Sequence, residues 1–161
     1  MSTMKIEISD DDLALLDLGF ELWEKENLQE ALEAFDIAAE NNRVCALRAH
    51  IAKGLIFLEL HRVDKAELEF RSALEVNPFS RRASFFLYST LVDEGRLQEA
   101  IAEGLRFFEG RKSTKEDRLI KEYRKQVEAL TSYNSEQLDE VRSIARGQKK
   151  SRLKRSIVEP S

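Results

Sequence analysis

Residues 28–42 read LQEALEAFDIAAENN, and the same pattern returns in residues 63–77, VDKAELEFRSALEVN. Each stretch places an alanine, then a phenylalanine four positions later, then an alanine three positions after that. A weaker third copy reads LQEAIAEGLRFFEG. The first alanines of the copies, Ala31, Ala66 and Ala100, are 35 and 34 residues apart. A repeat of this length predicts stacked helical hairpins, because a single hairpin cannot bury its apolar face alone.

A glycine precedes each of the two strong copies, at Gly19 and Gly54. Small residues on both helices of a hairpin let the helices approach closely. Phe35 and Phe70 are then expected to fill the space between one hairpin and the next.

The third copy departs from this pattern at three positions. Tyr88 replaces the small residue, Gly104 stands where an aromatic is expected, and Phe107 replaces a small residue. We therefore expect a similar hairpin with altered packing.

Turn and capping residues divide the chain into helices. Asn41-Asn42 and Asn77-Pro78 separate the repeats, and Gly95 lies in the turn inside the third. Ser9 with Asp12, and Ser113 with Glu116, are typical of helix starts. The helices of the repeats are expected at 10–25, 28–41, 44–60, 63–76, 80–94 and 97–109, followed by a helix at about 115–131 and a shorter one at about 135–146.

These motifs resemble the tetratricopeptide repeat family over about residues 12–112. The resemblance implies an all-α solenoid of three hairpins, in residues 1–112, whose first helices line a concave face. Residues 113–146 are expected to form C-terminal helices that cap its open end. From residue 147 onward the sequence GQKKSRLKRSIVEPS is basic and poor in apolar residues, which predicts a disordered tail at 147–161.

Composition agrees with a folded helical protein. With 42% hydrophobic and 35% charged residues, six glycines and two prolines, the chain is too apolar for disorder and too poor in turn formers for a β protein. Its apolar runs fall far short of the roughly 20 residues that span a bilayer, so no membrane insertion is expected. The single cysteine, Cys45, fits a reducing compartment, and we expect a cytoplasmic protein.

The helix register assigns a set of mostly apolar residues to the concave face. A contiguous exposed apolar strip is costly unless something covers it, and an apolar segment of a client protein would do so. Arg48 and Arg82 could pair with a carboxylate on that segment. The alternative is that the C-terminal helices or a second copy fill the strip. The predicted groove residues are Leu16, Phe20, Trp23, Arg48, Ile51, Leu55, Leu58, Arg82, Phe85, Ser89 and Val92.

Two groups within the repeat family differ at this face. The co-chaperones that grip acidic tails of heat-shock chaperones use Lys and Asn where this sequence has Leu16 and Phe20. In architecture the chain resembles bacterial type III secretion chaperones that hold translocator proteins, and residues 78–100, PFSRRASFFLYSTLVDEGRLQEA, are similar to the third repeat of that family. This resemblance implies an apolar client segment and a homodimer formed through the acidic N-terminal region.

Charge is distributed unevenly along the chain. Residues 1–40 carry twelve acidic side chains and two lysines, whereas the last fifteen residues carry five basic side chains and Glu159. This gradient suggests oriented electrostatics toward a partner rather than a uniform nucleic-acid surface.

Residues that could support catalysis are scattered. His50, His61 and Cys45 have no zinc-binding or catalytic spacing, and no phosphate-binding loop or nucleophile elbow is present. We expect a binding module, a chaperone or assembly adaptor, with no enzymatic activity, cofactor or metal. The alternatives are a self-assembling structural subunit and an RNA-associated adaptor acting through the basic residues of 148–161.

Overall fold

The computed structural model describes residues 10–111 and 117–137, and the regular structure in these ranges is entirely helical. The bounds of the first six helices agree with the predicted ones to within one residue. They are α1 Asp10–Glu24, α2 Leu28–Asn41, α3 Arg43–Glu59, α4 Val63–Val76, α5 Arg81–Asp93 and α6 Leu97–Glu109.

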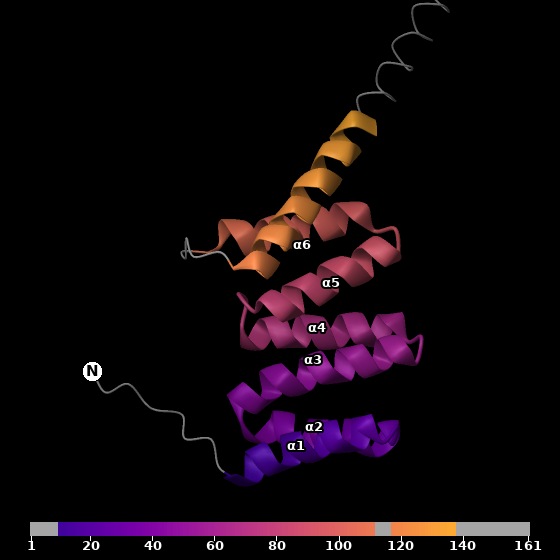
Figure 1. Cartoon of the computed structure of the whole chain (residues 1–161), viewed down its shortest axis with the longest axis vertical. Coiled ribbons are helices and arrows are strands. Elements are labelled where there is room, and N and C mark those ends of the chain that lie inside the picture. Colours follow the sequence, from indigo (N-terminus) through magenta and orange to yellow (C-terminus); the bar gives the residue numbers. More distant parts are fainter. Residues whose placement is uncertain (1–9, 112–116, 138–161) are drawn as a thin grey trace, which may run out of the picture. The chain divides into compact units, whose positions relative to one another are not determined.

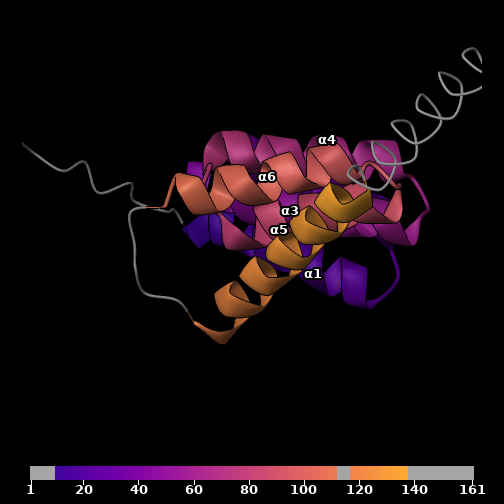
Figure 2. The same ribbon diagram turned by 90° about the horizontal axis from the view of Figure 1, so that it is seen from above.

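The six helices form three antiparallel hairpins, α1–α2, α3–α4 and α5–α6, that stack in chain order (Figure 1). The second helix of one hairpin packs against the first helix of the next, as α2 does on α3 and α4 on α5. Seen from above, α4 and α6 lie toward one side and α1 toward the other (Figure 2). The predicted helical-hairpin solenoid of three repeats is therefore confirmed.

The turn inside each hairpin has the same geometry three times. Its central residue, Glu26, His61 or Gly95, has a left-handed φ of 61°, 54° or 70°. In each turn the next amide donates to the carbonyl oxygen five residues back, as Arg62 does to Phe57 at 2.8 Å. This pattern satisfies the last carbonyls of the first helix. Glycine adopts this φ without strain, whereas Glu26 and His61 do not.

Side chains cap the helices at the junctions between hairpins. The Asn42 side chain accepts a hydrogen bond from the amide of Val44 at 2.8 Å and so begins α3. Ser80 accepts from the amide of Ala83 at 3.4 Å and begins α5. These contacts explain why the predicted punctuation marks the true boundaries.

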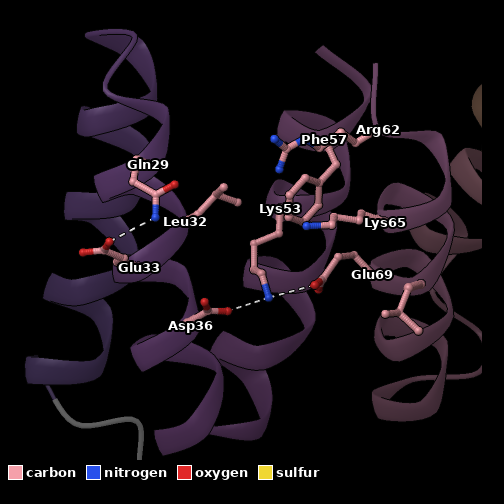
Figure 3. A pocket seen from close by; sticks show the side chains of 10 residues that line it. Gln29, Leu32, Glu33, Asp36, Lys53, Phe57, Arg62, Lys65 and Glu69 are labelled. Atoms are coloured by element: carbon pink, nitrogen blue, oxygen red, sulfur yellow. Dashed lines mark hydrogen bonds and ion pairs between the residues drawn. The ribbon is translucent and has the colours of Figure 1, made fainter. Parts of the chain in front are cut away.

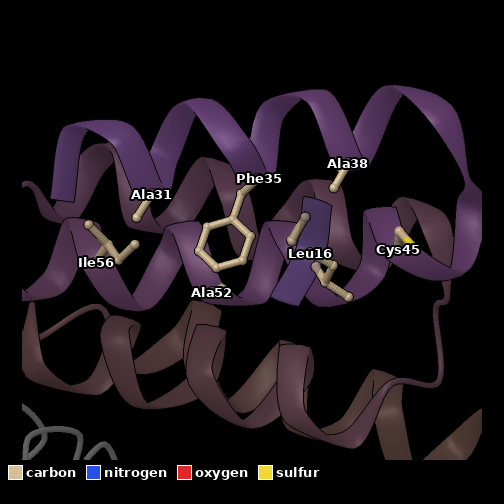
Figure 4. Packing of buried hydrophobic residues seen from close by; sticks show 8 residues of the cluster. Leu16, Ala31, Phe35, Ala38, Cys45, Ala52 and Ile56 are labelled. Atoms are coloured by element: carbon tan, nitrogen blue, oxygen red, sulfur yellow. The ribbon is translucent and has the colours of Figure 1, made fainter. Parts of the chain in front are cut away.

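An aromatic ring packed on a glycine sets the separation of the helices within the first two hairpins. Phe35 and Phe70 are fully buried, and a Cβ added at Gly19 would lie 2.6 Å from the Phe35 ring. Phe70 lies against Gly54 in the same way. Figure 4 shows Phe35 projecting from α2 into the core beside Ala52. The predicted role of the two glycines in close approach is confirmed; each phenylalanine also fills space inside its own hairpin.

The third hairpin exchanges the positions of ring and glycine. Tyr88 and Gly104 are 16 residues apart, as Gly19 and Phe35 are, and both are buried. From this spacing we expect the Tyr88 ring to lie opposite Gly104, with the ring supplied by α5 instead of α6. Phe107 is also fully buried. The hairpin itself is formed, as expected, and its altered packing stays a prediction.

Residues 116–161 form a second unit, in which 118–137 are helical. Its start is capped by Asp117, whose side chain accepts from the amide of Ile120 at 2.9 Å. The expected break near residues 132–134 is wrong. The Thr131 and Ser135 hydroxyls donate to carbonyls four residues back, so these residues continue the helix despite their weak propensity.

Some expectations fall outside the described ranges. They are the caps at Ser9 and Ser113, the helix beyond residue 137 and the tail at 147–161. The capping role of residues 113–146 stays a prediction.

Replacing Gly54 with alanine should destabilise the protein. The added methyl group would overlap the Phe70 ring, and overpacking costs about 1–3 kcal/mol. The gain in helix propensity, about 1 kcal/mol, opposes this cost. We expect a lower melting temperature by circular dichroism, and a less than additive loss when Phe70→Leu is combined with it. A melting temperature equal to or above that of the wild type would contradict this packing.

Replacing His61 with glycine should stabilise the protein by about 1 kcal/mol, because it relieves the left-handed strain. His61 is exposed, so little packing is lost. The matched change Gly95→Ala should destabilise by a similar amount, since nothing lies within 4 Å of its added Cβ and only backbone strain acts. Urea unfolding measures both, and a shift of the same sign in the two variants would contradict the assignment.

Candidate functional site

The first helices of the three hairpins line one pocket, which we call the groove. It has a volume of about 330 Å³. Two arginines and one serine join a majority of apolar side chains on its walls. The lining residues are Phe20, Trp23, Leu47, Arg48, Ile51, Ala52, Leu55, Ser80, Arg82 and Phe86.

The structure brings together six of the predicted groove residues. They are Phe20, Trp23, Arg48, Ile51, Leu55 and Arg82. The pocket does not include four others, which lie half-buried elsewhere: Leu58, Phe85, Ser89 and Val92.

The prediction that Leu16 lines the groove is wrong. Its side chain is fully buried in the cluster that contains Phe35, Cys45 and Ala49 (Figure 4). Because Cys45 and Ala49 of α3 are small, space remains in the core, and the larger Leu16 fills it.

Sequence reasoning missed Phe86, which lines the groove from α5. Its ring stacks on Phe70 at 5.6 Å between centroids, and this contact turns it toward α3 and α4. Its position could have been predicted from the sequence, because Phe86 follows Arg82 by four residues and the two therefore share one helix face. Leu47, Ala52 and Ser80 were also missed, because the lined stripe on α3 is wider than the predicted one.

Two aromatic side chains of α1 are held in place at one end of the groove. The Trp23 indole Nε1 donates to both carboxylate oxygens of Glu59, at 3.1 and 3.2 Å, and so joins α1 to α3. The Phe20 ring stacks on Trp23 at 6.4 Å and meets the Phe35 ring edge-on at 5.0 Å. These contacts fix the wall before any partner arrives, which lowers the entropy cost of binding.

The two groove arginines present unused donors. The Arg48 guanidinium lies over the Phe20 ring, 5.5 Å from its centroid, and remains exposed. Arg82 is exposed as well. Within residues 10–111 and 117–137, neither forms a salt bridge with a carboxylate. Both can therefore donate hydrogen bonds to an acidic group on a bound molecule.

The charges at the ends of α3 and α5 oppose the helix dipole. Helix α3 begins with Arg43 and ends with Glu59, and α5 begins with Arg81-Arg82 and ends with Asp93. Each such charge destabilises its helix by roughly 0.3–1 kcal/mol, whereas a charge of the opposite sign would stabilise it. The second helices of the hairpins, α2, α4 and α6, have an acidic residue in the first turn, as the dipole favours. Among α1–α6, only α3 and α5 thus begin with arginine, whereas acidic last turns also occur in α2, at Glu40, and in α4, at Glu75.

A second pocket, of about 390 Å³, lies between α2 and α4 and has α3 at its base (Figure 3). The ammonium group of Lys53 lies between two carboxylates, 2.5 Å from Asp36 and 2.8 Å from Glu69. Nδ1 of His50 is 2.7 Å from the other oxygen of Glu69. This network joins the first hairpin to the second, so the charged groups of its members are already paired within the fold.

Burial and pairing act in opposite directions on this network. Burial lowers the pKa of Lys53, but the hydrogen bonds with Asp36 and Glu69 outweigh it, and the pKa is raised above its ordinary value. Burial raises the pKa of Glu69, but its bonds with His50 and Lys53 outweigh that effect and lower the pKa below 4.5. Both side chains are therefore held in the charged form at neutral pH.

Among the described residues, no group of three or more His, Cys, Asp or Glu side chains could hold a metal ion. In the same part of the chain, every helix is too short or too polar to cross a membrane.

Comparison with known proteins places the hairpins in a family. A family model described as tetratricopeptide repeat matches residues 16–75 and 51–109. The fold is similar to that of the Hsp90 co-chaperone Cns1 from Saccharomyces cerevisiae, with a TM-score of 0.60 and 13% sequence identity. The match covers 89% of this chain but only 46% of Cns1, and at this identity it bears on the fold alone. No curated protein sequence matches the chain. The resemblance to type III secretion chaperones stays a prediction.

Replacing Glu69 with glutamine should destabilise the protein and flatten its acid dependence. In the wild type, the lowered pKa of Glu69 contributes stability above about pH 4.5, which is lost as the pH falls through the folded-state value. At neutral pH the variant should lose roughly 1–3 kcal/mol of unfolding free energy, because Lys53 and His50 lose a charged partner. Urea titrations at several pH values measure this. Glu33→Gln at the rim of the same pocket is the control, and parallel curves for wild type and Glu69→Gln would contradict the linkage.

Proposed function

The chain belongs to the tetratricopeptide repeat family, whose repeats are protein–protein interaction modules, and we propose that its groove holds an apolar segment of a client protein. The observation that carries this proposal is the wall of half-exposed aromatic and aliphatic side chains, fixed in position by Glu59 and Phe35. Large aromatics of this kind dominate the free energy of protein interfaces.

The chemistry of the groove favours a protein segment over a small polar ligand. Its apolar residues come from three different helices and lie beside exposed arginines. A peptide can place apolar side chains against Phe20, Ile51 and Phe86 while its carboxylates reach Arg48 and Arg82. In this role the protein acts as a chaperone or assembly adaptor that sequesters the segment until its delivery.

The contacts of the groove residues decide which of them can be replaced without disturbing the fold. Phe20 and Trp23 contact the core, so their removal would disturb the fold together with the groove. Ile51 lines the groove from the middle of α3 and is half-buried. Leu68 lies in the second pocket, is 63% exposed, and provides a matched position away from the groove.

A photo-crosslinking amino acid at position 51 should capture client segments that are rich in apolar residues. The same group at position 68 should not capture them. Mass spectrometry of the cross-linked peptides from a cell extract identifies the client and the bound segment together. Cross-links only to this protein's own peptides would instead favour the self-assembling subunit, and an absence of cross-links at position 51 would contradict the proposal.

The captured segment, made as a peptide without tryptophan, should shift the fluorescence of Trp23, the only tryptophan in the chain. Ile51→Glu should weaken its binding by about tenfold or more, because the new charge is desolvated. Leu68→Glu should leave binding unchanged. Circular dichroism checks that both variants keep their helicity, and Arg82→Glu, at an exposed position, serves if Ile51→Glu does not fold. Equal binding by groove and control variants would oppose the proposal.

A further inference from the structure

Two of the helices that line the groove carry an arginine in the groove wall and an acidic residue at their C-terminal end. Arg48 and Glu59 lie 11 residues apart on α3, and Arg82 and Asp93 lie 11 residues apart on α5. Eleven residues make about three turns, so each arginine shares a helix face with its acid. Ile51, Ala52 and Leu55 lie between the two charges of α3, and Phe86 lies between those of α5.

Three observations separate this pattern from an accident of surface composition. Arg82, Glu59 and Asp93 lie in the end turns of their helices with the sign that the helix dipole disfavours, so they do not serve helix stability. Arg48 and Arg82 line the groove itself, and no described carboxylate pairs with either. Glu59 bonds to Trp23, which places the acidic edge directly beside the aromatic wall.

The separation of the two edges indicates the width of the occupant. Eleven residues of helix separate the backbone positions of the arginine and the acid by about 16 Å. An α-helix with its side chains is about 10–12 Å across, and long charged side chains on its flanks can reach both edges. An extended chain is narrower, since neighbouring strands lie only about 4.8 Å apart, and it cannot contact both edges together.

We propose that the occupant is an amphipathic helix of the client, lying across α1, α3 and α5, with acidic residues along one flank of its apolar stripe and basic residues along the other. Its acidic flank pairs with Arg48 and Arg82, and its basic flank lies along Glu59 and Asp93. This inference rests on the proposed function and deepens it.

The arrangement also fixes the length and direction of the bound helix. Packed helices are about 8–10 Å apart, so crossing from α1 to α5 takes about 20 Å, or about 13 residues. Because the edges differ in sign, only one chain direction puts acid against arginine. The basic edge is carried by α3 and α5 alone, since α1 begins with Asp10, Asp11 and Asp12.

The test uses two synthetic peptides of about 14 residues with the same composition and no tryptophan. Both carry one leucine and phenylalanine stripe at helical spacing. In the segregated peptide, glutamates occupy one flank and lysines the other, whereas in the mixed peptide each flank alternates the two. Their net charge is identical, so only the arrangement differs. Trp23 fluorescence and calorimetry measure binding to the full chain.

The segregated peptide should bind about tenfold tighter than the mixed one. Arg48→Glu with Arg82→Glu should abolish that preference. Arg62→Glu with Lys65→Glu, the same change of charge at the second pocket, should preserve it. A segregated peptide interrupted by a central proline should lose about tenfold in affinity, because it cannot remain helical.

Equal binding of the segregated and mixed peptides would overturn the proposed charge pattern, and undiminished binding of the proline peptide would overturn the helix. Neither result would affect the proposed function while a peptide still occupies the groove. If no peptide binds but the cross-linked client segment does, the inference fails alone. If the client segment also fails to bind, the groove proposal fails with it.

Discussion

The contact of a phenylalanine ring with a glycine on the facing helix is the constraint on which the rest of the structure depends. Phe35 on Gly19 and Phe70 on Gly54 set how closely the two helices of a hairpin approach. The spacing inside each hairpin decides how the first helices align along the stack. That alignment brings side chains of α1, α3 and α5 to one groove. Residues that never contact a partner thus determine the width of the surface offered to it.

Polar contacts then fix one hairpin against the next. Lys53 on α3 pairs with Asp36 on α2 and Glu69 on α4, and the Arg43 guanidinium donates to the carbonyl of Val76 at 2.8 Å. The groove shares only α3 with this network, and its arginines are left without carboxylate partners in the described residues. The two surfaces therefore use charge differently. Paired charges hold the hairpins together, whereas the groove arginines stand without carboxylate partners beside the apolar strip.

Sequence reasoning was most successful where the repeat itself carries the information. The helix boundaries and the role of Gly19 and Gly54 follow from residue types that recur at a fixed spacing. The groove was harder to predict, because a shift of one residue in helix register exchanges a core position for a surface one. Leu16 fills space left by small residues on α3, and Phe86 turns inward to stack on Phe70. Both outcomes depend on neighbours that are distant in sequence.

The exchange of ring and glycine in the third hairpin bears on how such a chain can evolve. Every hairpin has its own aromatic residue and glycine 16 positions apart, so recombination at the junctions near Asn42 or Asn77 would move complete pairs and leave each core intact. A crossover inside a hairpin would not. Joining α5 to an α4-like helix would set Tyr88 against a second ring, whereas joining α3 to α6 would set Gly54 against Gly104 and leave a void. The whole hairpin is thus the smallest segment that can be inherited or shuffled without repair.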